Sequence, residues 1–135
     1  MMKRWLTLLF LGLTLTTVLI ACGSTGSGSN GSNSPNQSGP NQVHMDNNTF
    51  VQSTITIKKG ESITLIADTF SPHVIANGSW ENGSAKGAQE PGAPVIKAVQ
   101  VGGNSSATVG PFTTAGTFKL YCTVHQGMNL TVTVQ

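Results

Sequence analysis

Charged side chains are scarce in this chain of 135 residues, in which Asp, Glu, Lys and Arg together make up only 9%. Lys3 and Arg4, close to the start of the chain, account for the whole formal net charge of +2. The rest of the chain is therefore balanced, with neutral histidines. Because binding to nucleic acid needs a clustered surplus of basic side chains, we expect no nucleic-acid partner.

The sequence also lacks a segment in which apolar residues recur with a sustained helical period. Instead, apolar and polar residues alternate over short segments. Ile55 and Ile57 alternate with polar residues before a turn at 58–61, and the alternation resumes after the turn, which predicts a β-hairpin. Similar alternations mark residues 95–101, 116–122 and 129–134. With glycine and proline at short intervals, the pattern predicts an all-β, Greek-key β-sandwich.

The longest stretch without a strand pattern is residues 77–94, which are rich in Gly, Pro and Asn. Structureless inserts of this length are uncommon in compact domains and are often functional. The sequence predicts an irregular insert here, with Trp80 as its packing anchor.

Cysteine is limited to Cys22 and Cys122. Cys22 ends an apolar run that follows the basic start of the chain, and "LIAC" at residues 19–22 resembles the lipobox of bacterial lipoproteins. In that motif the cysteine is lipidated and becomes the mature N-terminus. We therefore expect a signal peptide over residues 1–21 and a lipid on Cys22; an uncleaved membrane anchor is the alternative.

Residues 22–41 form the predicted linker, and between 23 and 40 they include no large apolar side chain. Such a segment cannot bury enough surface to offset its ordering entropy, and as a flexible coil it spans roughly 20–25 Å. We expect it to tether a monomeric domain, residues 42–135, to the outer face of the cytoplasmic membrane in the cell envelope.

Cys122 lies in "YCTVHQGM", where His125 and Met128 follow it at intervals of three residues. A lone thiol in an oxidising compartment must be buried or metal-bound. Gly127 and the flanking strand patterns indicate a tight loop that can turn the three side chains toward one point. One thiolate, two imidazoles and a weak thioether form a set that suits copper in a trigonal electron-transfer centre.

The second imidazole of such a set has two candidates. His73 precedes a short apolar run and is the predicted ligand, whereas His44 lies next to the linker and is expected to be solvated. Two other interpretations remain. Zinc can bind a thiolate and two imidazoles, although a thioether is a poor fourth ligand for it. Alternatively, Cys122 is an inert core residue, with His125 solvated and Met128 in the core.

"YCTVHQGMNLTVTV" resembles the C-terminal signature of cupredoxins, the type 1 blue copper proteins that include plastocyanin and amicyanin. "TFVQSTITIKKGESITLIA" is similar to the opening strands of that family, and the likeness covers residues 42–135. The resemblance implies that His73, Cys122, His125 and Met128 bind one type 1 copper ion. Val74 departs from the family, in which an asparagine commonly follows the first histidine and helps to tie the ligand loops together.

The resemblance implies a blue copper protein that shuttles single electrons between redox proteins, such as a cytochrome and an oxidase or reductase, through the loop histidine. A copper chaperone or scavenger that holds Cu(I) at the cell envelope is the alternative. We do not expect an enzyme, because Tyr121 and Thr123, rather than a histidine, flank Cys122. A binuclear centre would also need another cysteine in the loop.

Overall fold

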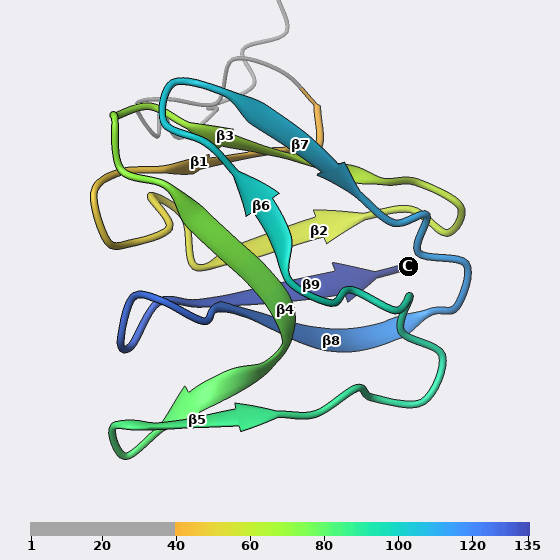
Figure 1. Cartoon of the computed structure of the whole chain (residues 1–135). Coiled ribbons are helices and arrows are strands. Elements are labelled where there is room, and N and C mark those ends of the chain that lie inside the picture. The colour runs from red at the N-terminus through yellow and green to blue at the C-terminus, as the bar shows by residue number, and fades with distance from the viewer. Residues whose placement is uncertain (1–39) are drawn as a thin grey trace, which may run out of the picture. The chain divides into compact units, whose positions relative to one another are not determined.

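The computed structural model describes residues 40–135, which form nine β-strands and no helix (Figure 1). The predicted signal peptide, Cys22 and nearly all of the predicted linker lie outside the described residues. The strands are β1 (Gln42–Met45), β2 (Thr54–Ile57), β3 (Ile63–Ala67), β4 (His73–Glu81), β5 (Ser84–Gly87), β6 (Val99–Val101), β7 (Ser106–Val109), β8 (Gly116–Cys122) and β9 (Asn129–Val134). Residues 40–135 contain no helix that is long and apolar enough to cross a membrane.

The strands form two sheets, which lie as two layers in Figure 1. The smaller sheet has the order β1-β3-β7, and the larger has the order β2-β9-β8-β4-β5, with β6 also paired to β4. β1 pairs with β3 and β2 pairs with β9 in parallel, and the other ladders are antiparallel. This confirms the predicted all-β sandwich.

The core lies between the sheets and takes one face of most strands, whereas β5 is exposed along its whole length. On β8, Phe118, Leu120 and Cys122 are buried, as their alternation predicts. On β9, the buried residues are Leu130, Val132 and Val134. The smaller sheet contributes Val43, Met45, Ile63, Leu65 and Val109.

The predicted hairpin through residues 58–61 is wrong. β2 and β3 do not pair with each other: β2 joins β9 in one sheet, and β3 joins β1 and β7 in the other. Ile57 and Ile63 are both buried, so the two strands face one core from opposite layers. Period-two alternation shows that one face of a strand is buried, but it does not show which strand lies alongside.

The predicted structureless insert at residues 77–94 is also corrected. β4 continues to Glu81 and turns through Asn82-Gly83 into β5, with Glu81 paired to Ser84. Asn82 and Gly83 have φ values of 50° and 78°, as a two-residue type I′ hairpin requires. β4 changes partner at Gly78: residues 75–77 pair with β8, and residues 78–81 pair with β5.

Candidate metal centre

His73 begins β4, directly after the turn that leads from the smaller sheet to the larger one. Its backbone pairs with Val101 of β6, and its side chain is 1% exposed. A histidine is rarely buried so completely unless its ring has a partner. The strand therefore presents the imidazole to the interior of one end of the sandwich.

Cys122 ends β8, and residues 123–128 form the loop to β9, which we call the ligand loop. The backbone N–H of Cys122 donates to the Met128 carbonyl at 3.0 Å, and the N–H of Met128 donates to the His125 carbonyl at 3.3 Å. Gly127 has a φ of 80°, which a glycine adopts without strain. Cys122 and Met128 are buried, whereas His125 is partly exposed. The tight loop expected from the sequence is confirmed.

Three potential ligand atoms meet at this end. The Cys122 Sγ lies 3.5 Å from the His125 Nδ1 and 3.9 Å from the His73 Nδ1, and the two Nδ1 atoms are 3.2 Å apart. Within residues 40–135, His73, Cys122 and His125 are the group of this kind that is close enough to hold one metal ion. Cys122 is a free thiol there.

The spacing of these atoms fits a small, soft metal ion. A trigonal ion about 2.0–2.3 Å from two nitrogens and one sulfur separates them by about 3.5–3.8 Å. The observed separations of 3.2, 3.5 and 3.9 Å lie close to that range. Pairing of β4 with β8 fixes the two strands that carry His73 and Cys122.

Burial lowers the pKa of His73, and the electrostatic influence of the nearby His125 lowers it further. The backbone and carboxylate of Asp46 act in the opposite direction without reversing the shift. Slight burial raises the pKa of Asp46 itself, but hydrogen bonds from Asn48 and Thr49 outweigh it, so the pKa of that carboxyl is lowered. His73 thus stays neutral at ordinary pH, the form that binds metals.

Val74 and Thr123 connect the two ligand-bearing segments through their backbones. The N–H of Thr123 donates to the carbonyl oxygen of Val74 at 2.8 Å. The side chain of Val74 cannot make the amide hydrogen bond that an asparagine would provide, but the sheet supplies a tie at the same place.

The prediction for His44 is wrong. His44 lies in β1 and is 8% exposed, and its Nδ1 is 2.9 Å from both carboxylate oxygens of Asp68. The segment after β1 folds back over it, because the N–H of Val51 donates to the His44 carbonyl. Proximity to the linker misled the prediction, since β1 pairs with the interior strand β3 and is held in the sandwich. The metal-binding group does not include His44.

Trp80 has a direct connection to the ligand loop that the sequence did not reveal. Its indole Nε1 donates to the Cys122 carbonyl at 2.7 Å, and its ring packs edge-on against Tyr121. The only sequence signal for this position is Asn82-Gly83, which marks a hairpin turn and would have extended β4 through Trp80.

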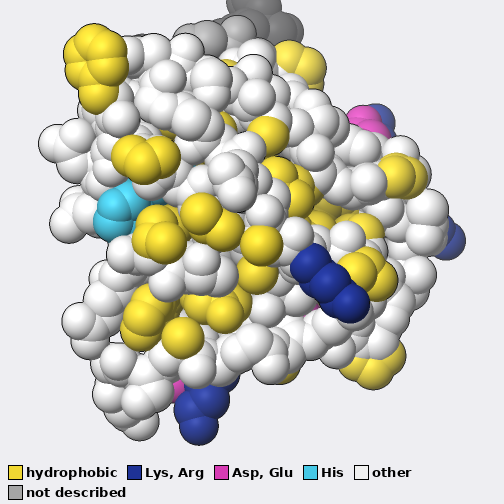
Figure 2. All heavy atoms as spheres, in the orientation of Figure 1, with side chains coloured by type: hydrophobic (Ala, Val, Ile, Leu, Met, Phe, Trp, Pro, Cys, Tyr) yellow, Lys and Arg dark blue, Asp and Glu magenta, His cyan; other side chains and the backbone are white. Residues whose placement is uncertain are grey.

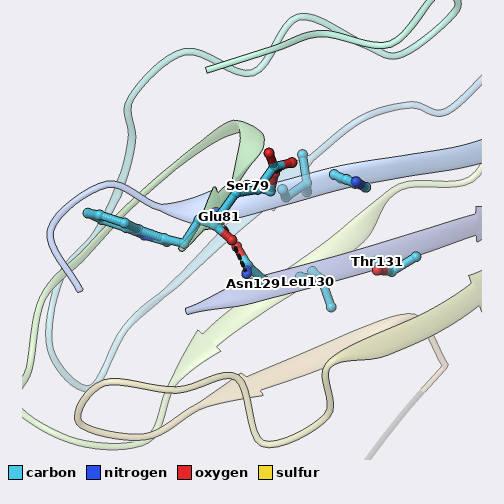
Figure 3. Close-up of a pocket in the computed structure, with 8 residues that line it drawn as sticks. Ser79, Glu81, Asn129, Leu130 and Thr131 are labelled. Carbon is cyan, nitrogen blue, oxygen red and sulfur yellow. Dashed lines mark hydrogen bonds between the residues drawn. The ribbon is translucent and has the colours of Figure 1, made fainter. Parts of the chain in front are cut away.

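A cavity of about 180 Å³ lies beside Trp80, between the outer end of β4 and the strands β8 and β9. Figure 3 shows the Asn129 side chain reaching across this space to the β4 backbone. Ser79 and Glu81 line it, and the Ser79 hydroxyl donates to a Glu81 carboxylate oxygen.

The surface near the site is largely uncharged. Figure 2 shows a histidine side chain at one edge of a face on which hydrophobic side chains gather. Among the histidines of residues 40–135, His73 and His44 are buried, whereas His125 is partly exposed. Val124, next to it in the ligand loop, is 57% exposed.

A family model described as copper binding proteins, plastocyanin/azurin family, matches residues 38–135. The chain belongs to this family, the cupredoxins. Copper is therefore its cofactor, with a cluster like a type 1 site around Cys122. Cupredoxins are electron carriers and are generally not enzymes.

Solved structures support the fold. Amicyanin from Paracoccus versutus matches with a TM-score of 0.54 and 19% identity, over 73% of this chain and 84% of that chain. A purple cupredoxin from Nitrosopumilus maritimus matches with a TM-score of 0.54 and 20% identity, over 70% of this chain and 98% of that one. A search of curated proteins found no match. At identities of 19% and 20%, these structures show that the chain shares their fold.

Proposed function

We propose that this cupredoxin shuttles single electrons between two redox proteins, and that His73, Cys122, His125 and Met128 are its copper ligands. The observation that carries the proposal is the mutual approach of one sulfur and two nitrogen atoms to within 3.9 Å. Bound copper supplies a one-electron couple between Cu(II) and Cu(I). A donor protein loses one electron to the oxidised centre, and an acceptor protein takes one electron from the reduced centre.

Each side chain has a separate task in this function. Cys122 provides a thiolate at the end of a buried strand, and the two imidazoles complete a plane with it. Met128 is 2% exposed and is the proposed weak axial ligand. The pairing of β4 with β8 holds His73 and Cys122 in one arrangement, so little atomic movement is needed when the charge changes.

His125 is the proposed point of electron exchange, because it is the ligand that is partly exposed. Exposed Val124 beside it favours a neutral docking surface, in keeping with the balanced charge of the chain after Arg4. Small and transient interfaces are typical of redox encounters. We propose a cytochrome or an oxidase- or reductase-type protein as donor and acceptor.

Storage or delivery of Cu(I) is the alternative function. A delivery site needs ligands that an acceptor can reach, yet Cys122 is 0% and His73 is 1% exposed. Burial of two of the three clustered ligands therefore favours electron transfer over delivery.

The test is a visible spectrum of the full chain, purified in detergent and loaded with Cu(II). We expect an intense thiolate-to-copper band and a reversible one-electron wave. Cys122→Ser should remove the band, whereas His44→Ala should retain it. A colourless oxidised protein, or transfer of Cu(I) to an acceptor without reversible voltammetry, would contradict the shuttle.

We further propose that Cys22 is lipidated and anchors the monomeric domain to the outer face of the cytoplasmic membrane. The support is the sequence "LIAC" after a basic and apolar start. Metabolic labelling with a fatty acid should mark the wild-type chain and not Cys22→Ser. An unlabelled wild-type chain, or equal labelling of Cys22→Ser, would contradict the lipid anchor.

A further inference from the structure

Cys122 and Met128 lie opposite each other at the base of the ligand loop, and one backbone hydrogen bond joins them instead of the two that such a pair usually makes. In an antiparallel ladder, two residues of a hydrogen-bonded pair exchange both N–H···O=C bonds. Here Cys122 donates to the Met128 carbonyl, but the N–H of Met128 goes to His125 at 3.3 Å. The Cys122 carbonyl is thus left without its ladder donor at the start of the loop.

The indole of Trp80 fills this position. Its Nε1 donates to the Cys122 carbonyl at 2.7 Å, the short end of the range for an N–H···O bond. Trp80 comes from a different hairpin, 42 residues earlier in the chain. A residue outside the ligand loop therefore provides the missing contact at its first end.

The second end of the loop is held by the same residue. The Asn129 side chain accepts from the Trp80 N–H at 2.7 Å and donates to the Trp80 carbonyl at 3.1 Å (Figure 3). Asn129 directly follows Met128 and pairs with Tyr121 in the ladder. Its amide thus joins the outer end of β4 to the exit of the ligand loop.

The hairpin reaches the middle of the loop as well. The Gln126 side chain donates to the Gly83 carbonyl at the hairpin turn, at 3.3 Å. Gly78 makes this approach possible, because it has a φ of 126° and an added Cβ would clash with the Lys86 carbonyl. β4 bends there, and its outer half forms the β4–β5 hairpin that bears Trp80.

We propose that Trp80 and Asn129 form a clamp that positions the copper-ligand loop and sets the properties of the centre. Trp80 is a positioning residue, because it acts through the Cys122 backbone. The hydrogen of the indole N–H is the positive end of its dipole and points at the cysteine. It favours the reduced centre, which carries one positive charge fewer. The inference rests on the proposed copper ligands.

The test compares Trp80→Phe and Asn129→Ala with the wild-type full chain in detergent. Trp80→Phe keeps an aromatic ring and removes the indole donor, whereas Asn129→Ala removes both contacts with the Trp80 backbone and keeps the indole. Val109→Ala is the control, because this residue is 4% exposed on β7, in the other sheet. It should lower stability without changing the loop.

Two measurements are made on each variant. In the metal-free protein, hydrogen exchange of the ligand-loop amides 123–128 should be about fivefold faster in Trp80→Phe, as expected for the loss of one neutral hydrogen bond. It should be faster again in Asn129→Ala. In the copper-loaded protein, Trp80→Phe should shift the thiolate-to-copper band and lower the reduction potential. Val109→Ala should do neither.

The outcomes separate this clamp from the proposed function. A colourless wild-type protein contradicts the copper ligands. A coloured wild-type protein whose Trp80→Phe variant keeps its band, potential and exchange rates overturns the clamp. A change in thermal stability alone, like that of Val109→Ala, overturns it too. If Trp80→Phe does not fold, Asn129→Ala decides, and unchanged loop exchange in that variant refutes the clamp.

Discussion

The N–H of Thr123 donates to the carbonyl oxygen of Val74 at 2.8 Å, which joins the residue after the ligand cysteine to the residue after the ligand histidine. This hydrogen bond continues the pairing of β4 with β8, in which Ile75 lies opposite Cys122, by one residue beyond the end of β8. Because the tie is made by backbone atoms, no side chain is needed at position 74. Sheet pairing therefore holds His73 against Cys122.

Substitution of Met128 tests the axial position. Met128→Leu should keep the visible band, because the thiolate remains, and should raise the reduction potential, because a weak donor to the oxidised ion is lost. The expected rise is about 59 mV or more, the one-electron equivalent of a tenfold change in the equilibrium constant. Voltammetry measures it. Met45→Leu, at a 0% exposed position in β1, is the control. An unchanged potential for Met128→Leu would show that Met128 is not axial.

The stability of the metal-free protein should depend on pH through His73. Its pKa in the folded state lies below the ordinary value of 6.5. As the pH falls through about 6.5, His73 is therefore protonated in the unfolded chain but stays neutral in the folded chain. The free energy of unfolding then decreases until the pH reaches the lowered pKa of the folded state. Above 6.5 this contribution is absent. Urea unfolding at pH 7.5 and 5.5 should show a smaller loss in His73→Gln than in the wild type. Equal losses would contradict the shift.

His44 should contribute to stability and not to the copper centre. His44→Ala removes the partner of Asp68 and opens space beneath residues 46–51, so we expect a loss of about 1–3 kcal/mol in the free energy of unfolding. Urea denaturation of the metal-free protein measures this loss, and the visible spectrum of the loaded protein should stay the same. Loss of colour would mean that His44 binds copper in place of His73.

Gly78 should tolerate no side chain. Gly78→Ala places a Cβ against the Lys86 carbonyl at a position with positive φ, and the combined clash and strain should cost about 3 kcal/mol. Gly60→Ala is the matched control: its φ is also positive, at 87°, but nothing lies within 4 Å of an added Cβ. It should cost about 1 kcal/mol. Chemical denaturation compares them, and equal costs would mean that the bend at Gly78 relaxes freely.

Local patterns predicted the buried faces and the loop that carries Cys122 and His125, because alternation and ligand spacing are properties of short segments. His73, which lies 49 residues before Cys122, was inferred instead from the need for a second imidazole and from the resemblance to the cupredoxins. They did not predict which strands pair: the turn at residues 58–61 connects two sheets, since register between distant segments depends on the whole core. His44 was misplaced because its partner, Asp68, lies 24 residues away. The connection of Trp80 to Cys122 spans 42 residues and depends on the bend at Gly78.

The parallel pairing of β1 with β3 also has a consequence for orientation. β3 runs toward the turn that leads to His73, so Gln42, at the start of β1, lies at the opposite pole of the sandwich. Gln135 lies at that far pole too, because its carbonyl accepts from the N–H of Lys59 (Figure 1). The chain therefore enters the domain at the pole opposite to His73. Gln42 and Gln135 thus both lie away from the pole with His125, so neither crowds the proposed point of electron exchange.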